Sequence, residues 1–569
     1  MIGRTALTAS QVALQVTGNN IANAATVGYH RQRVGLTPLP GDQLTAGVFA
    51  GRGVGLSEIR RLVDPALQAR VRSSRSDEQA AGVGLTILNT LESLTNELTG
   101  IDLSSELSAF FNSFSELANN PSGTATRTTV IERGVSLATY VRTLRSDLIE
   151  ARVQIEKELG TNVQRADELL SNIASLNGAI VNSELGRGEE GNLRDQRELL
   201  LGELAELMDI TVIEQADGAM SILVDSVPVV QGTVSRGLEL DIESGTTDLV
   251  VRVLTKTRPE ALTIRSGRIG ALLEQRKEAM VSTIDDLDTV ASQLIFQVNR
   301  LHTAGRPDGR LRDATGWLTV PAADQALSFN DPTNETFAGL PFAMENGSFR
   351  VTITDENGNA SETTVFLDLD GIDLTGAVGY GDDTDLQSLV ADLDAIANLN
   401  AQITPGGQLR VFTDAGFDVS FSEDSSGALA VLGINTFFTG RDGGDIGVRQ
   451  ALQDDPRMLV VGADAATNDT ALAIAGLRER ALDELSGATI TEKWLSTVER
   501  NAVKTSAAAT RAQALSSVRQ SLEAQEAAMS GVSLDEESVN LITYQQQFQS
   551  AARFIAVTDE LTSVLLSLV

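Results

Sequence analysis

The chain has 569 residues, which is enough for three or four domains with sizeable cores. Its 44 basic and 77 acidic residues give a formal net charge of −33, which disfavours nucleic acid and anionic lipid as partners because both attract cationic surfaces. The chain contains no cysteine, which excludes disulfides, thiolate metal sites and cysteine nucleophiles.

Residues 5–24 are predicted to form a helix with an apolar residue at every seventh position. The repeat lies on a polar, Ala-rich background and consists of Leu7, Leu14 and Ile21. This spacing is typical of helices that bury a narrow seam against a partner helix. The periodicity ends before Gly28, and the Gly, Pro and Val residues up to Ser57 indicate loops with short strands.

Three long helical segments are predicted next. The first begins at Asp64-Pro65, where a proline suits the first helical position. The second has the clearest apolar stripe of the chain, with steps of 4, 3, 4 and 3: Leu103, Leu107, Phe110, Phe114 and Leu117. The third runs from Leu137 toward Ile180.

The periodicity then changes twice from helix to strand. Residues 210–266 carry short runs of β-branched residues separated by Asp-Gly and Gly-Thr turns, which indicates strands. A helix is predicted over 268–302, followed by a second β-rich insert over 306–440 with a hairpin at 355–359. Residues 465–530 are predicted to be helical again.

The C-terminal 541–569 repeat the pattern of the N-terminal helix. One heptad register holds Leu541, Phe548, Ile555 and Val569, and three positions after that register lie Tyr544, Ala551 and Leu565. A helix of this length is marginal in water without a partner, so the two ends are expected to pair with each other or with copies of the chain. Residues 1–35 carry a net charge of +3 and residues 531–569 a net charge of −4, which would steer that pairing.

The sequence therefore predicts an α+β multidomain fold: a discontinuous helical rod whose coiled-coil core is made from both termini, with inserted β-rich domains. Four domains are expected. They are a terminal coiled-coil assembly domain (1–60 with 531–569), a helical rod domain (61–208, 268–305 and 441–530), a small β insert (209–267) and an acidic β-rich outer domain (306–440).

Two segments invite a ligand-binding interpretation. Gly51-Arg52-Gly53-Val54-Gly55 lacks the Lys-Ser/Thr pair of a phosphate-binding loop, so a turn into a short strand is favoured. An acidic stretch could bind calcium, but without EF-hand spacing a solvated, self-repelling surface is favoured; it contains Asp368, Asp370, Asp373, Asp382, Asp383 and Asp385.

Nothing in the sequence supports catalysis. The two histidines, His30 and His302, lack neighbouring metal-ligand residues, and no nucleophile-elbow signature is present, so neither an enzyme nor a cofactor is expected. No run of 18 apolar residues predicts a membrane span. The N-terminus has no hydrophobic signal-peptide segment, so an exported chain would keep its N-terminus intact.

Motifs at both ends resemble one family. Residues 5–32, with Asn20-Ile21-Ala22-Asn23 and Gly28-Tyr29-His30-Arg31-Gln32, resemble the opening of bacterial flagellar rod, hook and hook-associated proteins. Residues 531–549, from Gly-Val-Ser-Leu-Asp-Glu-Glu to Tyr-Gln-Gln-Gln-Phe-Gln, are similar to the matching end. Internal segments favour the hook-associated protein 1 family: Asp195-Gln196-Arg197, Gly270-Ala271-Leu272-Leu273 and Leu432 through Gly440.

The resemblance implies a structural subunit of the flagellum that joins hook to filament after type III export without a cleaved signal peptide. Its terminal helices would stay disordered until they pair and stack in the assembled tube. The implied partners are copies of itself, the hook protein, the second junction protein or flagellin, and an export chaperone. The assembly interface is expected at Leu7, Leu14, Asn20, Ile21, Asn23, Gly28, Tyr29, Leu541, Tyr544, Phe548, Ile555 and Leu565.

Two alternatives remain from the sequence. The chain could be the hook protein or another axial protein, although the long helical stretch over 64–205 disfavours the hook protein. It could also be a secreted adhesin or hydrolase carried on a helical stalk. Departures from the family pattern occur at Val27, where Pro is usual, and at His30, where Ser is usual.

Overall fold

The computed structural model describes residues 1–45, 47–97, 100, 102–185, 188–244, 249–373, 375–464 and 467–567. These residues form two compact units. Unit 1 comprises 1–87, 154–277 and 505–569, and unit 2 comprises 88–153 and 278–504. Within the described ranges, no helix combines the length and the apolarity needed to cross a lipid bilayer.

Unit 1 is built mainly from long helices. Its helices, some of which it shares with unit 2, are α1 (Ile2–Ala22), α2 (Pro65–Leu94), α4 (Thr124–Glu184), α5 (Gly191–Leu207), α6 (Gly267–Gln275), α13 (Ile490–Ser530) and α14 (Leu534–Ser567). The predicted start at Pro65 is confirmed, because Oδ1 of Asp64 accepts hydrogen bonds from the first free backbone N–H groups of α2, at Ala66 and Leu67.

Unit 1 also contains two groups of strands. Near the N-terminus lie β1 (Gln32–Pro38), β2 (Asp42–Thr45), β3 (Val48–Ala50) and β4 (Val54–Arg61), with β1 antiparallel to β4 and β2 antiparallel to β3. The predicted small insert forms β5 (Thr211–Glu214), β6 (Met220–Val224), β7 (Val227–Gln231), β8 (Val234–Ser235), β9 (Leu238–Ser244) and β10 (Leu249–Thr255). Strands β5 to β8 form one sheet in chain order, and β9 pairs with β10.

Arg197 holds this small sheet against the helices of unit 1. Its guanidinium Nη1 donates to Oδ1 of Asn177 at 2.8 Å and to the carbonyl of Gly218 at 2.7 Å. The Asn177 amide in turn donates to two carbonyls of the sheet, Met220 and Gly232. Arg197 is 1% exposed, and burial lowers its pKa to about 10, since desolvation disfavours the charged form.

Unit 2 holds the remaining helical core. Besides its parts of α2, α4 and α13, it contains α3 (Leu103–Asn119), α7 (Ser282–Thr303), α8 (Glu335–Ala338), α9 (Leu386–Asp394), α10 (Ala428–Leu432), α11 (Gln450–Asp454) and α12 (Asp469–Gly476). Short 3₁₀ turns lie at Pro456–Met458, Leu477–Glu479 and Asp483–Leu485. The predicted stripe of α3 is confirmed, because all five of its apolar side chains are buried.

The segment around Phe437 and Phe438 lies in the core of unit 2. Phe437 packs edge-on against Phe438 with ring centroids 4.7 Å apart, and it lies 5.6 Å from Phe110 on α3. The side-chain amide of Asn299 accepts from both phenylalanine N–H groups and donates to the carbonyl of Phe438. This family segment is therefore a structural joint between α3 and α7.

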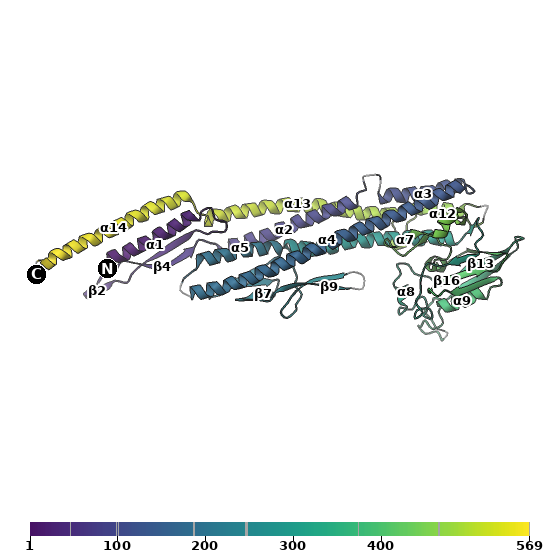
Figure 1. Ribbon diagram of the computed structural model, residues 1–569, viewed down its shortest axis with the longest axis horizontal. Coiled ribbons are helices and arrows are strands. Elements are labelled where there is room, and N and C mark those ends of the chain that lie inside the picture. The colour runs from purple at the N-terminus through teal and green to yellow at the C-terminus, as the bar shows by residue number, and fades with distance from the viewer. Residues whose placement is uncertain are drawn as a thin grey trace. The chain divides into compact units, whose positions relative to one another are not determined.

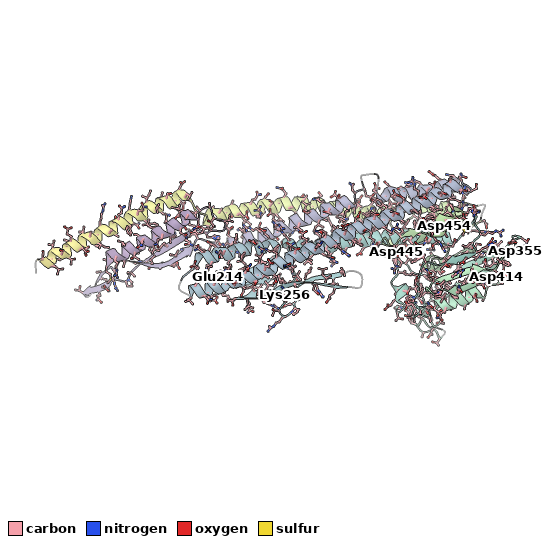
Figure 2. The ribbon with its side chains drawn as sticks, viewed as in Figure 1. Glu214, Lys256, Asp355, Asp414, Asp445 and Asp454 are labelled. Carbon is pink, nitrogen blue, oxygen red and sulfur yellow. The ribbon has the colours of Figure 1, made fainter. Side chains whose placement is uncertain are left out.

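The strands of unit 2 form small antiparallel sheets. They are β11 (Arg306–Pro307), β12 (Asp313–Thr315), β13 (Gly347–Asp355), β14 (Ala360–Leu367), β15 (Leu399–Ile403), β16 (Leu409–Thr413), β17 (Phe417–Ser422), β18 (Phe438–Thr439), β19 (Gly447–Val448) and β20 (Val460–Gly462). The sheet orders are β12-β16-β15, β14-β13-β17, β11-β20 and β18-β19. The predicted hairpin at 355–359 joins β13 to β14, and Asp355 at its turn is labelled in Figure 2.

The predicted α+β multidomain architecture with helical ends and two β-rich inserts is confirmed. The four expected domain boundaries stay a prediction. The helix expected over 268–302 contains a feature that the sequence did not indicate. Residues Arg276–Val281 form a π-helical segment between α6 and α7, in which one residue more than an α-helical turn is accommodated.

Candidate functional site: the paired terminal helices

Helices α1 and α14 pack antiparallel within unit 1 (Figure 1). Gly3 near the start of α1 lies against Ile555, and Asn20 near its end lies against Glu537 at the start of α14. The two ends of the chain therefore pair with each other inside one subunit.

Small and polar residues form the most deeply buried face of α1. They are Gly3, Ala9, Ser10, Ala13, Val16, Thr17 and Asn20. Most of these residues repeat every seven positions. One series is Gly3, Ser10 and Thr17, and the other is Ala6, Ala13 and Asn20, of which Ala6 is half-buried. A Cβ atom at Gly3 would lie 2.7 Å from Cγ1 of Ile555, so only glycine permits this close approach. Small side chains thus let the two helices come close together.

The apolar heptad residues expected on α1 lie one position beyond this face. Leu7, Leu14 and Ile21 are half-buried. They follow positions 6, 13 and 20, so they flank the contact with α14 and do not form its centre. Their role in assembly stays a prediction.

On α14, four of the expected residues share one face. Leu541, Tyr544, Phe548 and Ile555 are half-buried, and the same face carries the buried residues Glu537 and Ala551. The other expected residue, Leu565, is 65% exposed. The heptad position Val569 lies outside the described residues.

Helix α14 continues beyond its contact with the start of α1. Past Phe554, every described residue except Ile555 is exposed. The exposed large apolar side chains past Phe554 step by 4 and 3 and then cluster: Val557, Leu561, Val564, Leu565 and Leu566. This free stripe has the spacing of a helix seam without a helix of the same subunit to cover it.

A polar network joins the end of α1 to the start of α14. Asn20 is 1% exposed, and its side-chain amide donates to Oε2 of Glu537 at 3.1 Å and to the carbonyl of Gln32 at 2.9 Å. Its Oδ1 accepts from the hydroxyl of Tyr29 at 2.8 Å and from the N–H of Gln32 at 3.0 Å. All hydrogen-bonding groups of this buried amide are therefore used.

Arg31, from the basic N-terminal segment, forms ion pairs with two glutamates of the acidic C-terminal segment. Its Nε donates to Oε1 of the buried Glu537 at 2.8 Å, and its Nη1 lies 2.6 Å from Oε2 of the exposed Glu536. Burial lowers the pKa of Arg31, but the hydrogen bonds and charges of the two carboxylates outweigh it, so the net shift is upward. The charge complementarity expected from the sequence is realised by these three residues.

Tyr29 stays a neutral donor in this network. Its hydroxyl donates to Asn20 and accepts from the side-chain amide of Asn19 at 3.1 Å. Burial, followed by the charges of Asp195 and Glu537, raises the pKa of Tyr29 to about 12. Asn23, another expected residue, donates to the carbonyl and the side chain of Asn19 and so supports the end of α1.

Gly28 allows the chain to reverse after α1. Its φ is 77°, in the left-handed region that favours glycine, and a Cβ there would lie 3.4 Å from Cδ1 of Leu199. The neighbouring Val27, where the family pattern has Pro, is 84% exposed.

Asp195 on α5 connects this turn to the helix, and the sequence analysis does not predict this contact. One oxygen of Asp195 lies 2.8 Å from Nδ1 of His30 and accepts from Nη1 of Arg61 at 2.8 Å. Its other oxygen accepts from the backbone N–H of His30 at 3.2 Å. The Asp195-Gln196-Arg197 segment was recognised only as part of the family resemblance, because 165 residues separate His30 from Asp195.

The Gly51–Gly55 segment is a turn into a strand, as expected. It leads into β4, and its Gly53 has a φ of 101°. A Cβ at Gly53 would collide with Oγ1 of Thr5 on α1. The glycine therefore serves the packing of this turn against α1.

A groove of about 610 Å³ runs between α1, α14 and the β1/β4 pair. Its walls are mostly small or polar, and include Ala6, Ala13, Leu36, Tyr544, Gln547 and Ala551. The paired termini thus offer both a groove and an exposed apolar stripe to other molecules.

Three segments match known protein families. Residues 88–312 match the flagellar hook-associated protein FlgK helical domain. Residues 2–30 match the flagella basal body rod protein family, and residues 525–568 match the C-terminal region of flagellar basal body rod FlgEFG proteins.

Curated relatives carry the same name across almost the whole chain. Flagellar hook-associated protein 1 of Salmonella typhimurium is 25% identical over 587 residues, covering 99% of this chain and 98% of the relative. The protein of that name from Escherichia coli is 24% identical with the same coverage. The one from Bacillus subtilis is 28% identical and covers 57% of this chain and 71% of the relative.

A solved structure of the flagellar hook junction protein FlgK from Burkholderia pseudomallei is a weaker match. It has a TM-score of 0.48 and 14% identity over 80% of this chain and 99% of that one. The two terminal matches, the central helical match and the full-length relatives all point to one family. From these, the chain belongs to the flagellar hook-associated protein 1 family and has a structural role as an axial protein of the bacterial flagellum.

Proposed function

We propose that this chain joins the flagellar hook to the filament, and that its paired terminal helices form the seam through which subunits assemble. The observation that carries the proposal is the uncovered end of α14. Several large apolar side chains lie there in helical register without a covering element of their own subunit. A contiguous exposed apolar stripe of this kind marks a surface for another protein.

The contact between α1 and α14 supports assembly-coupled order. Its centre is made of small side chains, which bury little apolar area and so stabilise a helix pair weakly. The polar network at Asn20, Arg31 and Glu537 fixes the register of the pair. Neighbouring subunits would add the apolar area that the pair itself lacks.

The proposed partners are those that the family resemblance implies, and the uncovered stripe supports contacts between copies of the chain. Copies of the same chain would pack their α14 stripes and grooves against one another, as expected for repeated contacts in a tube. The hook protein would lie on one side of the ring, and the second junction protein or flagellin on the other. Export through the flagellar type III route, with a chaperone that covers the terminal helices, completes the proposal. No reaction or cofactor is involved.

The direct test is a charge placed in the uncovered stripe. Leu565→Asp should leave both units folded and exported but abolish incorporation, because a carboxylate in an apolar seam is strongly disfavoured. Leu541→Asp and Phe548→Asp, on the half-buried face, should also abolish incorporation, but through the pairing of α14 with α1. The measurement is complementation of a deletion strain, with filaments counted by electron microscopy and shed protein assayed in the medium.

The matched control is Phe366→Asp. Phe366 is 72% exposed on β14 in unit 2. Like Leu565→Asp, its substitution replaces an exposed apolar side chain by a carboxylate, but outside the terminal helix pair. This variant should assemble normally. The deletion strain itself should show hooks without filaments and flagellin in the medium. Normal filaments with Leu565→Asp would refute the proposed seam.

A further inference from the structure

The acidic outer region of unit 2 contains one place where carboxylates converge. Asp368, Asp370 and Asp383 each offer one oxygen atom, and these atoms all lie within 4.8 Å of one another. Asp383 is 5% exposed, whereas the other two lie at the surface. Three negative charges at this separation repel one another unless a cation lies between them.

Other carboxylates of the same stretch are held by their own loops. Asp355, labelled in Figure 2, accepts from the backbone N–H groups of Asn357 and Asn359, both at 2.8 Å. Asp373 accepts from the N–H groups of Thr375 and Ala377, and Asp385 caps α9. These residues fit the solvated surface that the sequence predicted. The three converging carboxylates are arranged differently.

Unpartnered oxygen atoms are the second observation at this place. Oδ2 of Asp383 accepts from the side-chain amide of Asn330 at 2.7 Å and from the N–H of Gly371 at 3.1 Å. Across the described residues, no donor reaches Oδ1 of Asp383, although this atom is buried. The same holds for Oδ1 of Asn330 and Oδ1 of Asp382. Oδ1 of Asp383 belongs to one of the three converging carboxylates and can only accept, so a cation would satisfy it and a further acceptor would not.

The chain supplies little positive charge to this region. Residues 351–400 contain eleven Asp or Glu residues and neither Lys nor Arg. The adjacent Arg350 is already paired with Glu362 on β14 and with Glu423, which directly follows β17. The charge at the converging carboxylates is therefore best balanced by an ion from solution.

The backbone around the carboxylates is already closed into a loop. Asp368 and Thr384 exchange hydrogen bonds, with the N–H of Thr384 donating to the Asp368 carbonyl at 2.7 Å and its hydroxyl accepting from the Asp368 N–H at 2.9 Å. The hydroxyl of Ser328 lies 2.5 Å from the Tyr380 carbonyl and 3.0 Å from the Asp383 carbonyl. The ligand atoms are thus held together before any ion binds, which reduces the entropy cost of binding.

We propose that Asp368, Asp370 and Asp383 bind one Ca²⁺ ion, with Asn330 positioning Asp383 and offering its amide oxygen as a further ligand. Ca²⁺ accepts six to eight oxygens in irregular geometry, which suits loop carboxylates of this kind, whereas Mg²⁺ demands a regular octahedron. The ligand set contains no nitrogen or sulfur, which disfavours Zn²⁺. The ion would fasten the end of β14 to the loop before α9.

Calorimetry on the full chain is the first test. We expect one Ca²⁺ per chain with a dissociation constant of about 10⁻⁴ to 10⁻³ M, as in extracellular calcium modules. Asp383→Asn keeps the size of the side chain and should weaken binding at least tenfold, and Asp370→Asn should weaken it as well. The control Asp392→Asn removes the same charge from an exposed position on α9 and should leave the affinity unchanged.

Terbium luminescence localises the site. Tyr380 lies beside Gly371, where its Cε1 would be 3.7 Å from an added Cβ, and so it can sensitise a Tb³⁺ ion bound in place of Ca²⁺. Tyr380→Phe should remove the sensitised emission while Ca²⁺ binding by calorimetry is kept. Absence of Ca²⁺ binding at 10 mM, on the order of ten times the weakest constant expected, would overturn the proposal. Equal affinity in Asp383→Asn and Asp392→Asn, or tighter binding of Mg²⁺ than of Ca²⁺, would overturn it too.

Discussion

Glu537 is the acidic residue on which the polar contacts of the two chain ends converge. It accepts from the Asn20 amide and from Arg31, and its side chain is 2% exposed. Its neighbour Glu536 also pairs with Arg31, but with a side chain that is 63% exposed. Arg31 thus makes one ion pair that is shielded from water, with Glu537, and one that is solvated, with Glu536. The loss of the shielded pair should cost much more stability than the loss of the solvated one.

This difference predicts unequal effects of two alanine substitutions. Glu537→Ala leaves Arg31 and Asn20 without their buried acceptor and should destabilise the α1/α14 pair by about 2–4 kcal/mol. Glu536→Ala should cost less than about 1 kcal/mol, because water replaces the exposed carboxylate. Amide exchange of α1 in isolated flagella, where the termini are expected to be protected, measures both. Equal protection in the two variants would contradict the assignment.

His302 is a buried neutral histidine in the core of unit 2. Its Nδ1 lies 2.8 Å from the carbonyl of Asn435, and its Nε2 accepts from the N–H of Val460 at 3.1 Å. Since Nε2 accepts, the proton belongs on Nδ1. Burial lowers the pKa of His302 to about 4, against a smaller upward effect of the Asn435 hydrogen bond.

This lowered pKa predicts acid destabilisation of unit 2. Above pH 6.5, both the folded and the unfolded states hold His302 neutral, and its stabilising effect is fully present. As the pH falls from about 6.5 to about 4, the unfolded chain takes up a proton that the folded chain refuses. The free energy of unfolding should then fall by about 3 kcal/mol from this residue.

The matched variant is His302→Gln, which can donate and accept but does not titrate in this range. Urea unfolding between pH 7 and pH 4, followed in parallel for both proteins, should show a flatter pH dependence for the variant. Identical slopes would exclude His302 as the group responsible.

At the scale of elements, the seven-residue period of α1 predicts that the helix pairs with a partner, and the structure pairs it with α14. Large apolar residues dominate the usual seam, so the sequence predicts that Leu7, Leu14 and Ile21 lie in it. Within one subunit these three side chains are half-buried, and their role in assembly stays a prediction. Gly3 and Ser10 are buried more deeply, and at Gly3 the side chain of Ile555 on α14 leaves no room for a Cβ atom.

Glycine substitutions test this close approach. Gly3→Ala should weaken the α1/α14 pair by about 1–3 kcal/mol, since the new methyl group overlaps Ile555. Gly18→Ala on the same helix meets nothing within 4 Å and should stabilise α1 by up to about 1 kcal/mol through helix propensity. Amide exchange of α1 in isolated flagella gives both values. Stabilisation by Gly3→Ala would refute the contact.

Other elements could be predicted from the sequence because local pattern determines them. The α3 stripe, the start of α2 and the hairpin at 355–359 all follow from side-chain spacing or from a turn signal, and the structure places them as expected. The π-helical segment at Arg276–Val281 could not be foreseen, because its local sequence continues an α-helical pattern. The contact between His30 and Asp195 needs tertiary information, because 165 residues separate the two in the sequence.

At the scale of the whole molecule, order should be distributed unevenly in the monomer. The aromatic core of unit 2 is packed from several segments, whereas α14 beyond Ile555 contacts little of its own subunit. The free energy needed to open a segment locally rises with the number of buried contacts that the segment makes. The chain should therefore combine slow-exchanging cores with rapidly exchanging ends.

Hydrogen exchange followed by mass spectrometry checks this expectation. In dilute monomer, residues 1–35 and the end of α14 should exchange fast, and the segments around Phe110 and Phe437 slowly. In isolated flagella the termini should become protected. Strong protection of residues 1–35 in the dilute monomer would contradict assembly-coupled folding.

The antiparallel pairing of α1 with α14 makes the first helix of the chain depend on residues more than 500 positions away. Helix α14 begins at Leu534, so a chain truncated before that residue lacks the helix that packs against α1. Such a fragment would carry only half of the contact through which we propose that subunits assemble. In that proposal, the contact between the two helices would also select against truncated chains.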